Sequence, residues 1–245
     1  MARINETAQR EPLRVMAIAA HPDDVELNCA GTLARCRQRG DNITIAIGCK
    51  GDSASTSLPG GDLATIRSRE ARASAEILEA QLIEMGLKDY CVDVNLETKR
   101  LFADAIRQAN PDIVLTHFHT DYGSDHNNTF VLVRDAALAA TVPNFMTARP
   151  AIPRMPLIFM WEPYGGYSFQ PEIYVDITET METKVKMLSC HQSQIEWAKN
   201  HGGTDFFDFI QTVAKYRGYQ SGVKLAEGFI SLKNSSNIRA GAVLP

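Results

Sequence analysis

Residues 13–26 read LRVMAIAAHPDDVE, an apolar run followed directly by a histidine, a proline and three acidic residues. The run 13–20 has the length and the continuous hydrophobicity of a strand that is buried on both faces. Residues 28–40, NCAGTLARCRQRG, then read as a helix that Gly40 closes. We therefore expect a strand, a polar turn and a helix in succession.

The same alternation continues along the chain. Strands are expected at 42–49, 82–86 and 112–118, and helices at 62–80, with Asp62 as N-cap, and at 96–109. The later part is less regular, with strands at 156–160 and 172–178, helices from about Thr178 to 194 and at 205–220, and an edge strand at 226–232. This order predicts an α/β fold with a doubly wound, mainly parallel sheet and helices on both faces.

Composition limits the class of protein. The 245 residues contain 44% hydrophobic and 22% charged residues and no evident linker, so we expect one globular domain over 1–245, with 1–12 as a frayed leader. The net charge of −4 and the mixed-sign helical segments argue against a nucleic-acid partner. No run approaches the ~18 apolar residues of a membrane helix. The five cysteines are scattered, which favours a reducing, cytoplasmic location, and homo-oligomerisation stays open.

Two polar clusters follow strands that the predicted topology places side by side. In the common strand order 3-2-1-4-5, ligands bind above the carboxyl ends of the first and fourth strands. The residues expected there are His21, Asp23, Asp24 and Glu26 after the first strand, and His117, His119, Asp121, Asp125 and His126 after the fourth.

The chemistry of these clusters favours a cation over a nucleotide. The first turn lacks the G-x-G-x-x-G pattern, and its acids would repel a pyrophosphate. Imidazole and carboxylate ligands suit Zn²⁺, and His21, Asp24 and His126 could hold it, although another divalent metal is possible. Zinc lowers the pKa of bound water to about 7, and of the adjacent residues Asp23 and Asp24 one could bind the metal while the other removes a proton as general base.

Several of these residues also have simpler interpretations. Asp23 could cap the following helix, and Glu26 could favour the positive end of that helix or support the turn. Asp125 could orient His126 or another group of its loop. His117 is most simply a satisfied buried histidine, and Arg67 could pair with a glutamate on its own helix.

The two motifs resemble those of a known family, the PIG-L/LmbE-type zinc-dependent N-deacetylases. AAHPDDVE at 19–26 is similar to the first signature of the family, and TDYGSDHNN at 120–128 is similar to the second metal motif. The resemblance extends over residues 66–80, 110–117, 174–194 and 226–229, and therefore covers most of the chain.

This resemblance implies a Rossmann-like fold in which His21, Asp24 and His126 hold zinc and Asp23 is the catalytic base. The implied reaction is hydrolysis of an N-acyl group, commonly N-acetyl, on a small molecule that contains an amino sugar. Arg67 resembles an arginine that contacts the substrate. His191 resembles a histidine that lines the far side of the pocket.

One position departs from the family pattern. Many members carry a histidine that helps polarise the carbonyl where this chain has Gly123. Tyr122, His119 or His191 could supply the missing hydrogen-bond donor to the substrate. The glycine also leaves two alternatives open: an amidase with a non-sugar N-acyl substrate, and a metal-binding module without catalysis.

Overall fold

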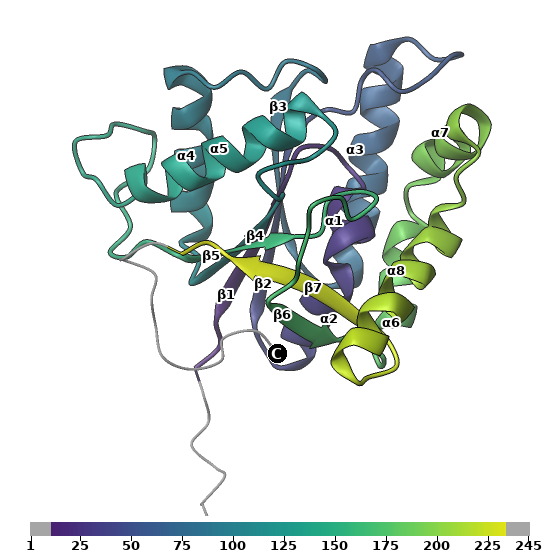
Figure 1. The fold of residues 1–245 in the computed structure, drawn as a ribbon. Coiled ribbons are helices and arrows are strands. Elements are labelled where there is room, and N and C mark those ends of the chain that lie inside the picture. The colour runs from purple at the N-terminus through teal and green to yellow at the C-terminus, as the bar shows by residue number, and fades with distance from the viewer. Residues whose placement is uncertain (1–10, 234–245) are drawn as a thin grey trace, which may run out of the picture.

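The computed structural model describes residues 11–233, and its centre is one mixed β-sheet (Figure 1). The strands are β1 (Arg14–Ala19), β2 (Asn42–Cys49), β3 (Gln81–Leu87), β4 (Ile113–Thr116), β5 (Leu157–Trp161), β6 (Ile173–Asp176) and β7 (Ala226–Ser231). They form a 7-stranded sheet in the order β3-β2-β1-β4-β5-β7-β6. The predicted order 3-2-1-4-5 is therefore confirmed.

The first five strands are parallel, and the last two differ. β1 pairs with both β2 and β4, so that Val15 lies between Ile43 and Ile113. β7 runs antiparallel to β5 on one side and to β6 on the other. The prediction of an edge strand at 226–232 is therefore wrong, because the segment inserts between two earlier strands.

Helices cover both faces of the sheet, as the doubly wound prediction requires. One layer contains α1 (Asp24–Asn28), α2 (Ala30–Gln38), α3 (Gly60–Ile77), α6 (Met181–Leu188) and α8 (Phe206–Ser221). The opposite layer contains α4 (Leu96–Ala109) and α5 (Ser124–Ala139), drawn in teal in Figure 1. α7 (Gln192–Gly202) lies beside α3.

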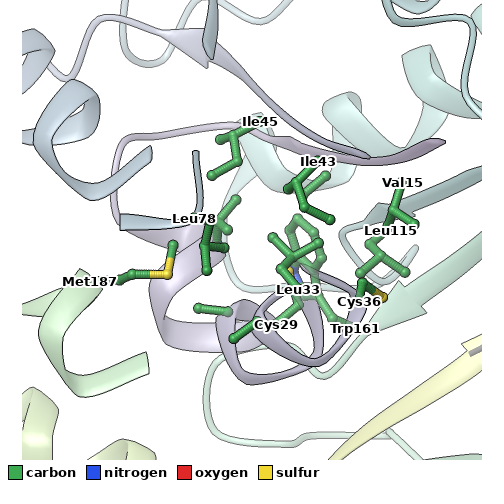
Figure 2. Close-up of a cluster of buried hydrophobic side chains, with 14 of the residues drawn as sticks. Val15, Cys29, Leu33, Cys36, Ile43, Ile45, Leu78, Leu115, Trp161 and Met187 are labelled. Carbon is green, nitrogen blue, oxygen red and sulfur yellow. The ribbon is translucent and has the colours of Figure 1, made fainter. Parts of the chain in front are cut away.

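Strand β1 supplies side chains to both halves of the core, as its continuous hydrophobicity predicts. Val15 faces the larger cluster, and Met16 faces the cluster under α4 and α5. Figure 2 shows the larger cluster, in which Leu33 of α2 and Trp161 of β5 lie among β-branched side chains of the sheet. This packing fixes β1 and β4 as central strands, and it thereby fixes the loops that follow them.

Several element boundaries differ from the predictions. α3 begins at Gly60, two residues before the predicted cap Asp62, because the carbonyl of Pro59 accepts from Asp62 N and Leu63 N. The helix predicted from Thr178 to 194 breaks near His191 into α6 and α7. Helix α5 was not predicted. The leader predicted at 1–12 lies, for residues 1–10, outside the described residues.

No helix within residues 11–233 is both long enough and apolar enough to cross a membrane. The cytoplasmic location and homo-oligomerisation stay predictions.

Candidate metal centre and substrate cavity

A cavity of about 580 Å³ opens where β1 and β4 end. Both strands run in the same direction and pair directly, so the loops that follow them meet at one edge of the sheet. The cavity is lined by His21, Asp23 and Asp24 from the first loop, by residues 122–126 from the second, and by part of α7. The two polar clusters of the sequence therefore lie at one site.

Asp23 occupies an unusual backbone position in this cavity. Its φ of 103° lies in the left-handed region, which is strained for a residue other than glycine and costs on the order of 1–3 kcal/mol. Its carboxylate makes no capping hydrogen bond to α1, so the capping interpretation is wrong. Burial raises the pKa of Asp23 to about 6, with the charge of Arg67 opposing the shift. A carboxylate with such a pKa is suited to general-base chemistry near neutral pH.

Three side chains present ligand atoms toward one point. His21 Nδ1 lies 3.2 Å from His126 Nε2, and the Asp24 oxygens lie 3.4 Å from His126 Nε2 and 3.7 Å from His21 Nδ1. Bonds of about 2.0–2.1 Å to a tetrahedral zinc place ligand atoms roughly 3.3–3.4 Å apart. The spacing therefore fits the predicted ligand set.

Two further aspartates fix the rings of these histidines. His126 Nδ1 lies 3.0 Å from Asp121 Oδ2, and His21 Nε2 lies 3.1 Å from Asp125 Oδ2. Each ring nitrogen can donate to its aspartate, which leaves the lone pairs of His21 Nδ1 and His126 Nε2 facing each other. Two lone pairs at 3.2 Å require a proton or a cation between them. A divalent metal bound by both nitrogens would meet this requirement, as a proton does without metal.

The partner of His126 differs from the prediction. Asp125 was expected to orient His126 or another group of its loop, and the structure places it against His21 and the backbone N–H groups of Tyr90 and Val92. Asp121, and not Asp125, orients the imidazole ring of His126. Residue 125 lies in the first turn of α5, whereas residue 121 lies in the preceding loop and can reach the imidazole.

The electrostatics of the site are those of an acidic pocket. Burial acts to raise the pKa of Asp24, but His126 and His117 lower it below its ordinary value. Burial acts to lower the pKa of His126, but Asp24 and Asp121 raise it to about 9. Without a metal, the site therefore retains positive charge as protonated histidine, and a divalent cation would replace those protons.

Arg67 lies behind Asp23 and not at the open side of the cavity. It is only 2% exposed and donates to the carbonyl of Pro22 at 2.7 Å and to Asp23 Oδ1 at 3.3 Å. A Cβ on Gly51 would approach the guanidinium to 2.4 Å, so the glycine gives this side chain its space. Arg67 thus contacts the proposed base, and contact with substrate stays a prediction.

His191 and Glu26 form a buried pair near Asp23 that does not line the cavity. His191 is fully buried, and its Nε2 lies 3.2 Å from Glu26 Oε1. Glu26 also accepts a short hydrogen bond from Ser74 of α3. The expectation that His191 lines the pocket is therefore corrected, because the break before α7 turns its ring inward. Glu26 has the supporting contacts that were predicted for it.

The structure places only one of the two remaining candidates for a hydrogen-bond donor, Tyr122 and His119, at the cavity. Tyr122 lines the cavity, and its ring centroid lies 5.0 Å from that of His126. His119 is exposed, contacts Thr120 and Phe118, and is absent from the residues that line the cavity, which corrects its expected place. A Cβ on Gly123 would meet no atom within 4 Å, so the position of the usual family histidine is open space.

His117 matches the simpler interpretation. It is fully buried, its Nε2 accepts from Ala20 N at 2.9 Å, and its ring stacks on that of His126 at 4.2 Å. It therefore supports the ligand ring from behind.

Two contributors to the cavity, Trp197 and His201, were not predicted. Asp121 was expected near the site as part of the second polar cluster, but its role toward His126 depends on where α5 begins. Trp197 and His201 of α7 line the cavity, and their rings stack at 4.4 Å. No local pattern links them to the metal motifs, because α7 reaches the cavity through its packing beside α3.

Known proteins have sequences related to this chain. A family model described as PIG-L, GlcNAc-PI de-N-acetylase, matches residues 16–137. The chain is 27% identical over 231 residues to a diacetylchitobiose deacetylase of Thermococcus kodakarensis, covering 88% of this chain and 81% of that protein. It is 24% identical over 229 residues to a 4-oxalmesaconate hydratase of Pseudomonas putida, covering 89% and 84%.

A solved structure extends the comparison to the fold. The N,N′-diacetylchitobiose deacetylase from Pyrococcus horikoshii, complexed with its inhibitor, superposes with a TM-score of 0.79 at 26% identity. The alignment covers 91% of this chain and 84% of that one. The residues that the family model matches, 16–137, include both polar motifs and strand β4, and most of strand β1. The chain belongs to the PIG-L family.

Proposed function

We propose that this protein is a zinc-dependent hydrolase that removes an N-acyl group, in the first place N-acetyl, from a small molecule containing an amino sugar. The observation that carries the proposal is the ligand set His21, Asp24 and His126, with a second acid, Asp23, beside it and free of a capping role. A metal site without catalysis has no use for a buried, strained carboxylate of raised pKa.

Different residues of the site have different roles in the proposed amide hydrolysis. Zinc at this site would supply Lewis acidity toward a carbonyl and lower the pKa of a water molecule. Asp23 takes the proton of the attacking water and delivers it to the nitrogen of the leaving amine. Asp121 and Asp125 hold His126 and His21 in the tautomers that leave the ligand nitrogens free.

Tyr122 is the residue best placed to replace the donor that Gly123 lacks. Its ring packs edge-on against His126 at the cavity wall. A phenol is protonated at neutral pH and can donate to the developing oxyanion. The prediction that Tyr122 binds substrate rests on this position.

The relatives and the charge of the cavity support an amino-sugar substrate. Diacetylchitobiose, named for two of the relatives, is a neutral N-acetylated disaccharide. Among the described residues lining the main cavity, Arg67 is the only lysine or arginine, and it is already engaged with the chain. A substrate with several carboxylates, such as that of the hydratase relative, would find no free cationic side chain there.

The proposal is tested by metal analysis together with a screen for released primary amine. The purified protein should contain close to one zinc per chain and release amine from N-acetylglucosamine derivatives, and chelation should abolish the release. N-acyl amino acids and other non-sugar amides are the comparison panel. A 4-oxalmesaconate hydration assay tests the alternative activity.

The outcomes separate the alternatives. Amine release only from non-sugar amides would replace the substrate class and keep the mechanism. Hydration without amine release would replace the reaction. Metal binding with neither activity would indicate the non-catalytic module, and absence of metal would overturn the proposal.

A further inference from the structure

A second cavity of about 390 Å³ lies next to the proposed active site. The two cavities share three lining residues, Ala54, Trp197 and His201. The rings of Trp197 and His201 stack at 4.4 Å with an interplanar angle of 12°. The two spaces therefore adjoin at the stacked rings of Trp197 and His201 on α7.

The second cavity differs from the first in its chemistry. Its lining combines an apolar floor, which includes Leu63 and Ile66, with hydroxyl and amide side chains from the loop after β2 and from α7. Two acids, Glu70 and Glu196, lie in the lining, and no lysine or arginine among the described residues does. Glu70 accepts from the backbone N–H and hydroxyl of Ser193, whereas Glu196 forms no ion pair within residues 11–233.

We propose that this second cavity is a subsite for the part of the substrate that lies beyond the N-acylated unit. The inference rests on the proposed function and extends it to the substrate class: an elongated, polyhydroxylated molecule whose distal part is neutral or cationic. Together the two volumes approach the upper part of the ~300–1,000 Å³ range of small-molecule sites. One small N-acetylated unit needs only the first cavity.

The shape and the charge of the second cavity both favour an elongated, polyhydroxylated substrate. An outer face of the stacked pair Trp197 and His201 is an aromatic surface of the kind that packs against the C–H face of a pyranose ring. The hydroxyl and amide groups around them can exchange hydrogen bonds with sugar hydroxyls. The unpaired carboxylate of Glu196 repels an anionic group and attracts an amine.

Binding to the zinc-loaded Asp23→Asn protein tests the subsite without turnover. The chain has two tryptophans, of which Trp161 is fully buried, so a ligand-induced change in tryptophan fluorescence reports on Trp197. The probes are N-acetylglucosamine, N,N′,N″-triacetylchitotriose and UDP-N-acetylglucosamine. We expect the trisaccharide to bind at least tenfold more tightly than the monosaccharide, and the anionic nucleotide sugar to bind less tightly than the trisaccharide.

Two exposed neighbours on α7 give a matched pair of variants. Asn200 lines only the second cavity, and Lys199 lines neither. Asn200→Phe should weaken trisaccharide binding about tenfold and leave monosaccharide binding within twofold. Lys199→Phe should leave both unchanged. Glu196→Lys should raise the affinity for UDP-N-acetylglucosamine relative to the trisaccharide.

Several results would overturn the subsite. These are equal affinity for the one-unit and three-unit saccharides, preferred binding of the nucleotide sugar by the unaltered cavity, or an equal loss of both saccharides in Asn200→Phe. Because the readout is binding, the subsite can stand if the wild-type protein releases no amine. Amine release with no length dependence of binding would retain the proposed function and reject the subsite.

Discussion

Two buried clusters of charged side chains lie close to α1, and they are built in opposite ways. Lys184 of α6 and Glu227 of β7 form an ion pair of 2.6 Å, and both side chains are nearly fully buried. Lys184 also donates to the carbonyl of Leu27, and Glu227 accepts from Gly31 N and Thr32 N. Every charge of this pair has a protein partner.

The proposed metal site instead has more acids than permanent cations. Asp23, Asp24, Asp121 and Asp125 surround three histidines, His21, His117 and His126, and the guanidinium of Arg67. Such an excess of buried negative charge is tolerated where a cation binds. Internal charge balance therefore marks a structural cluster, whereas an excess of acids beside a cavity marks a functional one.

The largest expected effect is on catalysis. Asp23→Asn should lower kcat about 10²–10⁴-fold, because the general base is lost while asparagine tolerates the left-handed backbone. Zinc content and folding stability should be unchanged. The measurement is steady-state amine release. Asp62→Asn, an exposed carboxamide change on α3, is the control; an equal loss there would contradict a special role for Asp23.

Disruption of the balanced ion pair between Lys184 and Glu227 should lower the folding stability. Lys184→Met leaves Glu227 buried and uncompensated, so the free energy of unfolding should fall by about 3–5 kcal/mol. Denaturant unfolding measures this change. Lys186→Met removes the exposed pair with Glu182 and should cost no more than about 0.5 kcal/mol. A small effect at Lys184 would show that the two clusters are not built differently.

Removal of a supporting aspartate should act on metal affinity. Asp121→Ala frees the His126 ring and should weaken zinc binding about 10–100-fold, with near-normal kcat at saturating zinc. Competition with a chelating dye gives the affinity. Asp93→Ala, at an exposed position, is the control. Unaltered affinity in Asp121→Ala would argue that the histidines are held by other contacts.

The smallest expected effect is that of a substitution at Gly123. Its Cβ position is empty and its φ is −112°, so Gly123→His should change the free energy of unfolding by no more than about 0.5 kcal/mol. It should raise kcat several-fold by adding a donor beside the carbonyl. Gly123→Ala controls for the added bulk. An unchanged kcat would indicate that Tyr122 already performs this role.

Much of the architecture was predictable because it depends on local pattern. The continuous apolar runs of β1, β2 and β4 identify buried parallel strands, and the two polar motifs follow them. The candidate ligand set was predicted from residue chemistry and strand order, and the structure brings its three residues together. The insertion of β7 between β5 and β6 was not predictable, because antiparallel pairing across some 70 residues leaves no local trace.

The finer assignments failed where they depended on side-chain direction. Asp121 and Asp125 are equally plausible partners of His126 in sequence, and the first turn of α5 decides between them. His191 reads as a pocket residue, and the break between α6 and α7 turns it toward Glu26. Both outcomes follow from helix boundaries, which sequence patterns specify least well.

The position of β7 has a consequence for biosynthesis. The edge of β5, whose residues are all buried in the finished sheet, has no pairing partner until residues 226–231 have been made. At roughly 5–20 residues per second, a ribosome needs several seconds to cover that distance. During this interval the growing chain carries an open apolar strand edge, the kind of surface that chaperones bind and that promotes aggregation.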